Sequence, residues 1–190
     1  MTFPAKSKKL RAVFLIGFMG AGKTSVGIAL ARRLGWRFVD LDERVEKREG
    51  RKIAKIFAES GEAAFRRAET AALRELLDKS HRKPLVIALG GGAFVQAENA
   101  RLLKMSGAPV AFLDAPVEEL RRRCGPKGAT RPLFADENQF RQLYESRRSS
   151  YMQADIRVET TGQTVEQTAA VVASRLGLDG QDECSRSDKR

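Results

Sequence analysis

The residues with the clearest chemistry lie near the amino terminus, where residues 17–24 read Gly-Phe-Met-Gly-Ala-Gly-Lys-Thr. This spacing matches the G-x-x-x-x-G-K-[ST] pattern of phosphate-binding loops. Glycines let successive backbone N–H groups turn towards phosphate oxygens, Lys23 can reach the β- and γ-phosphates, and the Thr24 hydroxyl can bind Mg²⁺. We therefore predict a nucleotide site here. The alternative is a glycine-rich turn that binds nothing.

Two carboxylates separated by one residue, Asp40 and Asp42, follow a short strand-like segment at residues 36–39. Ligands of α/β proteins bind at the carboxyl edge of the sheet, where such residues lie. Asp42 can accept a proton from a substrate hydroxyl, and Asp40 can hold Mg²⁺ through water. Acidic residues are also favoured at helix starts, so the alternative is that both acids only cap the next helix.

Two further groups of residues can bind an anionic substrate. Arg66 or Arg67 can hold a carboxylate, because a guanidinium group matches its two oxygens. The alternative is an exposed helix face on which Arg66 pairs with Glu69 three residues later. The three glycines at residues 90–92 can present backbone N–H groups to a substrate or to the γ-phosphate, or they can form a plain tight turn.

The segment at residues 124–132 contains two glycines, two prolines and two basic residues, without apolar periodicity. This composition predicts a mobile loop. Phosphoryl transfer requires cations that close over the phosphates and exclude water, and Arg131, with Lys127, can supply them from this loop.

Bulk composition limits the classes of protein that this chain can represent. The chain has 190 residues, of which 42% are hydrophobic, enough for one packed domain. We find no apolar run of about 18 residues and no apolar signal segment, which predicts an unexported cytoplasmic protein without membrane contact. The two cysteines, Cys124 and Cys184, are far apart and predict neither a zinc site nor a disulfide. The net charge of +11 is spread over helices that also carry Glu, so we do not expect nucleic acid as the main partner.

Strand and helix patterns alternate along the chain, which predicts a parallel sheet covered by helices on both faces. We expect strands at residues 12–16, 36–39, 84–89, 108–113 and 155–159. We expect helices at residues 25–34, 96–105, 117–123, 136–152 and 164–176. Asp114 is predicted to cap the helix at 117–123, and Thr164 is predicted to cap the last helix.

Residues 43–77 lack strand patterns and predict a helical insertion between the second and third strands. We expect helices at 43–49, 52–60 and 62–77, with stops at Gly50 and Gly61. Such an insertion would stand over the sheet edge and hold a substrate. The domain organisation that we predict has three parts, a basic flexible arm at 1–11, a single domain at 12–177 and a polar disordered tail at 178–190.

Together and in this order, the motifs resemble those of the shikimate kinase family. The resemblance rests on residues 17–24, Asp40-Leu41-Asp42, Ile56-Phe57 with Gly61-Glu62, Phe65-Arg66-Arg67 with Glu69, residues 89–93 and Arg131-Pro132-Leu133. It extends from about Val13 to Leu176, and it implies a five-stranded parallel sheet of the nucleoside monophosphate kinase type. The substrate-binding helical region would be at about 42–78 and the mobile lid at about 124–134. It further implies transfer of the ATP γ-phosphate to the 3-hydroxyl of shikimate, with Mg²⁺, in chorismate and aromatic amino acid biosynthesis.

The same resemblance implies a role for each matching residue. Asp42 would be the base, Lys23 and Arg131 would neutralise the transferring charge, and Thr24 and Asp40 would hold the metal. The expected ATP contacts are Met19, Gly20, Ala21, Gly22, Lys23, Thr24, Arg123, Arg131 and Gln163. The expected substrate contacts are Asp42, Phe57, Phe65, Arg66, Gly90, Gly91, Gly92 and Arg147.

The sequence departs from the family pattern in two places. Where the family has Arg-x-Pro-Leu-Tyr, this chain has Arg147-Arg148-Ser149-Ser150-Tyr151, so either arginine can face the substrate. The segment after Cys124 contains Gly-Pro-Lys-Gly, so the adenine contacts of Arg123 and Gln163 rest on the resemblance alone.

The expected partners are the small molecules ATP and shikimate, and the expected state is a monomer. One alternative is another small-molecule kinase with a phosphate-binding loop, such as a gluconate kinase. A second alternative, from another class, is a nucleotide-dependent switch or binding module. The chain has no N-K-x-D motif for guanine, which argues against a GTPase switch.

Overall fold

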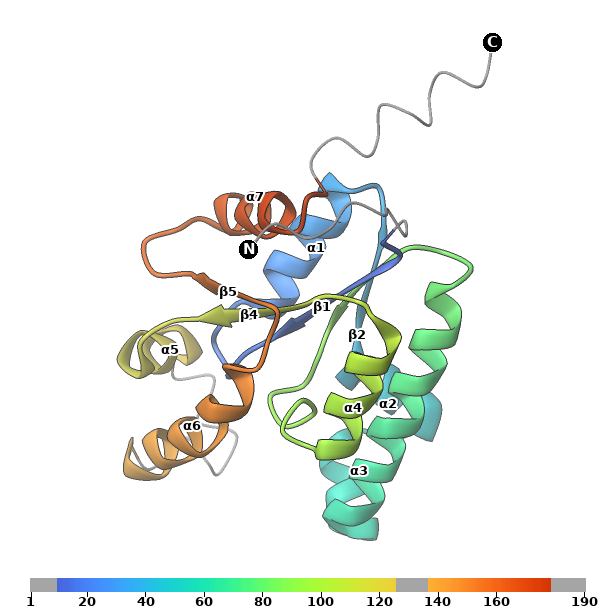
Figure 1. Cartoon of the computed structure of the whole chain (residues 1–190). Coiled ribbons are helices and arrows are strands. Elements are labelled where there is room, and N and C mark those ends of the chain that lie inside the picture. The colour runs from blue at the N-terminus through green and yellow to red at the C-terminus, as the bar shows by residue number, and fades with distance from the viewer. Residues whose placement is uncertain (1–9, 126–136, 179–190) are drawn as a thin grey trace.

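The computed structural model describes residues 10–125 and 137–178, and these residues form one five-stranded parallel sheet with helices around it (Figure 1). The strand order across the sheet is β2-β3-β1-β4-β5. The strands are β1 Ala12–Ile16, β2 Arg37–Asp40, β3 Leu85–Ala88, β4 Val110–Asp114 and β5 Ile156–Glu159. The predicted five-stranded parallel sheet is confirmed, and each strand overlaps its predicted range.

The three central strands are buried along their whole length, whereas the edge strands β2 and β5 are partly exposed. This difference follows from the sequence, because a parallel strand covered on both faces needs a continuous apolar run. Every residue of β1, β3 and β4 except Asp114 is apolar. Strand β1 therefore lies at the centre of the sheet and carries the phosphate-binding loop at its carboxyl end.

Helices lie on both faces of the sheet, as predicted. In Figure 1, α1 (Lys23–Arg33) and α7 (Val165–Arg175) lie together above the sheet. Below it lie α2 (Leu41–Glu49), α3 (Ile53–Ser80) and α4 (Ala97–Ser106). The remaining helices, α5 (Val117–Cys124) and α6 (Glu137–Tyr151), lie beside the β4–β5 end. No helix in the described ranges has both the length and the apolar character of a membrane span.

The helical insertion consists of α2 and α3, which pack against each other between β2 and β3. The two helices predicted at 52–60 and 62–77 are joined as α3, with Gly61 in a non-helical conformation at φ 77° and ψ 173°. Such a backbone is accessible to glycine and strained for other residues. The predicted break at Gly61 is therefore confirmed as a kink, while the helix continues on both sides.

One predicted cap is confirmed and one is wrong. Thr164 caps α7, because its hydroxyl accepts from Gln167 N and the Gln167 side chain accepts from Thr164 N. Asp114 does not cap α5, which begins after Pro116 without a side-chain cap. The Asp114 carboxylate is instead buried and accepts a hydrogen bond of 2.7 Å from Arg157 Nε on β5. This ion pair, in which Asp114 is buried and Arg157 is half exposed, binds Asp114 to the sheet and not to the helix start.

Candidate active site

The loop between β1 and α1 requires glycine at positions where other backbone segments approach it. A Cβ atom at Gly17 would lie 2.5 Å from the Leu113 carbonyl oxygen, and one at Gly20 would lie 2.5 Å from the Leu120 carbonyl oxygen. Gly22, at φ 84°, is the residue before α1 begins at Lys23. The loop is thus fixed against the end of β4 and against α5, with its N–H groups at the start of a helix, where phosphate groups bind.

Lys23 lies inside this loop. Its Nζ donates to the carbonyl oxygens of Gly17 and Phe18, each at 3.0 Å. Burial lowers the pKa of Lys23 from 10.5 to about 8, while the carboxylates of Asp42 and Asp40 act in the opposite direction. The ammonium group is therefore close enough to both predicted acids to be influenced by them, which places all three at one centre.

Asp40 connects the phosphate-binding loop with the helical insertion. Its Oδ2 accepts from the Thr24 hydroxyl at 3.0 Å, and its Oδ1 accepts from Asp42 N at 3.0 Å. The helix-cap alternative is therefore correct for Asp40, but the same carboxylate also reaches Thr24. A hydroxyl oxygen beside a carboxylate is the type of donor set that Mg²⁺ takes from a protein, so these two residues fit the metal.

The three glycines at 90–92 bring together side chains from three different helices. A Cβ atom at Gly90 would lie 2.5 Å from Asp42 Oδ1, and one at Gly92 would lie 2.8 Å from Arg66 Nη1. At Gly91 the nearest atom would be Arg147 Nη1, at 3.3 Å. The turn therefore lies between the predicted base and two guanidinium groups, and a side chain at Gly90 or Gly92 would displace Asp42 or Arg66 from these positions.

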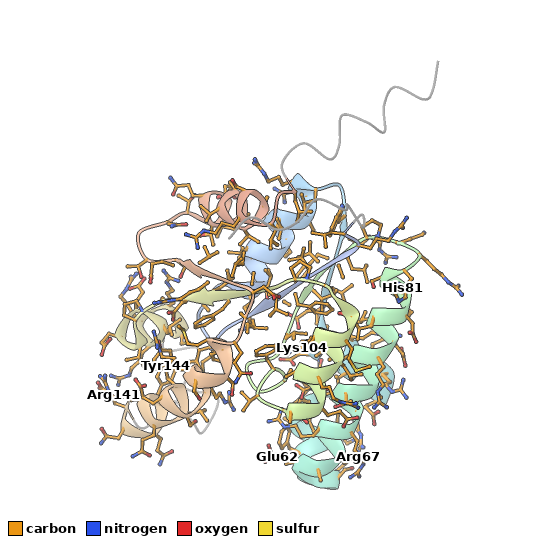
Figure 2. The ribbon with its side chains drawn as sticks, viewed as in Figure 1. Glu62, Arg67, His81, Lys104, Arg141 and Tyr144 are labelled. Atoms are coloured by element: carbon orange, nitrogen blue, oxygen red, sulfur yellow. The ribbon has the colours of Figure 1, made fainter. Side chains whose placement is uncertain are left out.

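Arg66 is oriented by two carboxylates and one aromatic ring. Its Nη1 lies 3.1 Å from Glu69 Oε2, its Nη2 lies 3.0 Å from Glu62 Oε1, and its Cζ lies 5.1 Å from the centre of the Phe65 ring. The Arg66–Glu69 pair considered as the alternative is thus present, at the same time as the contact with Gly92. Arg67 is exposed (Figure 2). Of the two arginines, Arg66 is therefore the one that faces the turn, where it approaches Gly92.

Neither Glu69 nor Gln96 was predicted to be a site residue. Glu69 is only 1% exposed, and burial raises its pKa, an effect that Arg66 opposes. The Gln96 side chain donates to Glu69 Oε2. Glu69 belongs to the motif that contains Arg66, which was the available signal. Gln96 precedes a helix with no distinguishing pattern, so nothing in the sequence indicated it.

The structure distinguishes Arg147 from Arg148. Arg147 approaches Gly91, and its Cζ lies 5.9 Å from the centre of the Phe18 ring. Arg148 points to other partners, with Nε 3.2 Å from the Tyr144 hydroxyl and Nη2 3.6 Å from Asp114 Oδ2. Of the two candidates, Arg147 is therefore the arginine beside the glycine turn.

Tyr151 was overlooked as a site residue, although it occupies the tyrosine position of the family pattern Arg-x-Pro-Leu-Tyr. Its side chain is fully buried, and its hydroxyl donates to the carbonyl oxygen of Gly91. Burial raises the pKa of Tyr151 to about 12, so the hydroxyl keeps its proton at neutral pH. Tyr151 thus fixes the glycine turn from the side of α6.

The predicted residues that are not yet described are two phenylalanines, the adenine-side residues and the basic residues of the lid. The Phe57 and Phe65 rings are 4.7 Å apart, with Phe65 buried and Phe57 partly exposed. Arg123 donates to Thr160 through Nη1 at 2.8 Å, and Gln163 N donates to the Thr160 carbonyl oxygen, so Arg123 and Gln163 meet at one turn. Arg131, Lys127 and most of the predicted lid, like most of the arm and the tail, lie outside the described residues.

The loop after β1, the acids after β2 and the glycines after β3 all meet at the carboxyl edge of one parallel sheet. A phosphate-binding loop that faces a carboxylate and two guanidinium groups can align a phosphate donor with an anionic acceptor. The fold and the site therefore define a small-molecule kinase with a phosphate-binding loop.

Comparisons with known proteins identify the family. The family model described as shikimate kinase matches residues 19–176. Shikimate kinase of Persephonella marina is 40% identical over 167 residues, which cover 88% of this chain and 99% of the relative. That of Cereibacter sphaeroides is 44% identical over 169 residues, which cover 87% and 82%. The chain belongs to the shikimate kinase family, and it is an ATP-dependent kinase.

Solved structures agree with this assignment. Shikimate kinase from Acinetobacter baumannii in complex with shikimate has a TM-score of 0.80 and 37% identity, over 92% of this chain and 97% of that chain. A gluconokinase from Sinorhizobium meliloti has a TM-score of 0.54 and 16% identity, over 87% and 92% of the two chains. The second likeness concerns the fold alone. Because the chain belongs to a kinase family, the alternative of a nucleotide-dependent switch or binding module is not supported.

Proposed function

We propose that the enzyme transfers the γ-phosphate of ATP to the 3-hydroxyl of shikimate and releases shikimate 3-phosphate and ADP. The observation that carries this proposal is the glycine turn at 90–92, which lies against Asp42, Arg147 and Arg66. The first can accept a hydroxyl proton, and the other two can bind a carboxylate. An acceptor with both groups fits this arrangement, and shikimate has both.

On the acceptor side, we assign the carboxylate of shikimate to Arg66 and Arg147, with the backbone N–H of Gly91 between them. Guanidinium groups bind carboxylates through paired hydrogen bonds, which fix orientation as well as position. Phe57 and Phe65 form the wall of the pocket. The hydroxyl would then face Asp42, whose carboxylate accepts its proton while the oxygen attacks the γ-phosphorus and the bond to ADP breaks.

On the nucleotide side, we assign the phosphates to the N–H groups of residues 19–24 and to the Lys23 ammonium group. Arg131 would add a second cation. Thr24 and Asp40 are the residues that would hold Mg²⁺, which supplies positive charge next to the β- and γ-phosphates. Arg123 and Gln163, which meet at the turn that begins with Thr160, would lie beside the adenine, as the family resemblance implies.

The acceptor is tested by ADP release with MgATP and either shikimate, gluconate or a nucleoside monophosphate. We expect turnover with shikimate and background rates with the other acceptors. Gluconate is the relevant competitor, because it also has a carboxylate and hydroxyls. Activity with gluconate and none with shikimate would overturn the proposal.

The base is tested by the Asp42→Asn variant, which keeps the shape of the side chain. We expect kcat to fall by about 10²- to 10⁴-fold, the usual contribution of a general base, with little change in ATP binding. Glu43→Gln, one residue later on α2 and exposed, is the matched control and should keep near-normal turnover. Normal turnover of Asp42→Asn would refute the assignment. The cytoplasmic location and the monomeric state stay predictions.

A further inference from the structure

A cavity of about 530 Å³ lies beside the edge strand β2, between α2 and the carboxyl-terminal part of α3. It is separate from the nucleotide loop and the glycine turn, since no residue of 17–24 or 90–92 lines it. Only Asp40 belongs to both places. The basic residues that line the cavity are Arg37, Arg44, Lys47, Lys79, Arg82 and Lys83.

These six cations are only partly neutralised. Asp40 and Glu43 are the two carboxylates in the lining, and Glu75 nearby pairs with Arg44 at 2.5 Å and with Lys79 at 4.0 Å. Within the described ranges, the other four cations have no ion-pair partner. Like charges that share one cavity repel each other, and a ligand with several negative charges would remove this repulsion.

Arg44 carries a second indication of a missing partner. One of its terminal nitrogens, Nη2, is bound to Glu75, but its Nε is buried and has no hydrogen-bond partner within the described part of the chain. Buried polar groups are almost always hydrogen-bonded, so a buried guanidinium donor without a partner is unusual. This donor belongs to a residue that lines the cavity.

We propose that this cavity is a second anion site, which binds a small molecule with two or more phosphate groups. Its volume is within the range of about 300–1,000 Å³ that is usual for small-molecule sites. Arginine binds phosphate through a planar pair of donors and lysine through a compact charge, and both types line the cavity. Phe38, Leu76 and Leu85 add an apolar wall that can contact the uncharged part of the ligand.

The test is calorimetric titration of the full-length chain with inorganic tripolyphosphate. ADP is present at the lowest concentration that occupies the nucleotide loop, because ADP itself has two phosphate groups and would compete for the cavity in excess. We expect saturable binding to one site. The double variant Arg82→Glu/Lys83→Glu should raise the Kd at least tenfold. Both residues are exposed and follow His81 at the far end of α3 (Figure 2), so the fold should tolerate the change.

The matched control is Arg101→Glu/Lys104→Glu on α4, which changes the net charge by the same amount. Lys104 is labelled in Figure 2, and no residue of α4 lines the cavity. This variant should keep the Kd within twofold. Equal weakening in both variants would mean attraction by net charge only, and would overturn the proposal, as would the absence of saturable binding. Inorganic phosphate should bind at least tenfold more weakly, and equal affinity would refute the requirement for two phosphate groups.

Discussion

The hydroxyl of Tyr151 on α6 donates a hydrogen bond to the carbonyl oxygen of Gly91, in the turn that follows β3. The two residues are 60 positions apart in sequence. Because Arg147 lies on the same helix and also approaches Gly91, α6 contacts the turn at two points. The carboxylate site that we propose therefore depends on how α6 is placed.

Removal of this hydroxyl, in Tyr151→Phe, should loosen the turn. The partly buried carbonyl of Gly91 loses its partner, which costs about 1–3 kcal/mol of stability. We expect the KM for shikimate to rise several-fold, while the KM for ATP stays within twofold. Steady-state kinetics with each substrate varied would show this difference. Tyr144→Phe is the control, since the Tyr144 hydroxyl lies 3.4 Å from Asp114 and Ala115 and away from the turn. A larger effect in Tyr144→Phe would contradict the role of Tyr151.

Arg147 and Arg148 should respond differently to truncation, although they are neighbours on one helix. We expect Arg147→Ala to raise the KM for shikimate by about 10- to 100-fold, as expected when a bond to a charged group worth about 1.5–3 kcal/mol is lost. Arg148→Ala removes one of the two arginines that pair with Asp114, so it should lower the melting temperature more than it changes the KM. Kinetics together with thermal unfolding would separate the two effects. The reverse pattern would mean that Arg148 binds the carboxylate.

Alanine substitutions in the glycine turn would displace neighbouring side chains of the site without removing any functional group. None of Gly90, Gly91 or Gly92 has a positive φ, so alanine suits their backbone and acts only through contact. Gly90→Ala should displace the Asp42 carboxylate and lower kcat, because the new Cβ would lie 2.5 Å from Oδ1. Gly92→Ala should displace Arg66 and raise mainly the KM for shikimate. Identical effects of the two variants on kcat and KM would argue against separate roles.

Deprotonation of Lys23 should set an upper pH limit on the activity of the enzyme. Because burial lowers the pKa of Lys23 to about 8, the free enzyme loses this positive charge as the pH rises through that value. We expect kcat/KM for ATP to fall above about pH 8. In the complex, the phosphates should hold the proton on Lys23, so kcat should fall only at higher pH. pH profiles of both parameters would show this separation.

The Lys23→Arg variant is the control for this titration, since a guanidinium group stays charged over the whole range. Its activity should be lower, but its alkaline limit should move to higher pH. Stability gives an independent measurement. Between pH 8 and 10.5, the usual pKa of a lysine, the unfolded wild-type chain binds more protons than the folded chain, so stability should rise with pH there. A limit near pH 8 that persists in Lys23→Arg would assign it to another group.

The sequence predicted those parts of the site whose positions depend only on the neighbouring segments of the chain. The loop at 17–24 and the acids at 40 and 42 each follow a strand, and their spacing alone places them at the carboxyl edge of the sheet. Arg147 could not be distinguished from Arg148 in this way, because the distinction depends on how α6 is rotated against Phe18 and Gly91. The cap expected at Asp114 was wrong for a similar reason, since Arg157, 43 residues later, determines where that carboxylate points.

The kink at Gly61 divides α3 between two parts of the pocket. Phe57 precedes the kink, and Phe65 and Arg66 follow it, so one non-helical residue separates the exposed wall from the residues that orient the carboxylate anchor. Sequence change in the segment before Gly61 can alter the shape of the pocket entrance while Arg66 keeps its contacts with Glu69 and the glycine turn. Because of this kink, the choice of acceptor can diverge among related enzymes, or be redesigned, while Arg66 stays in place.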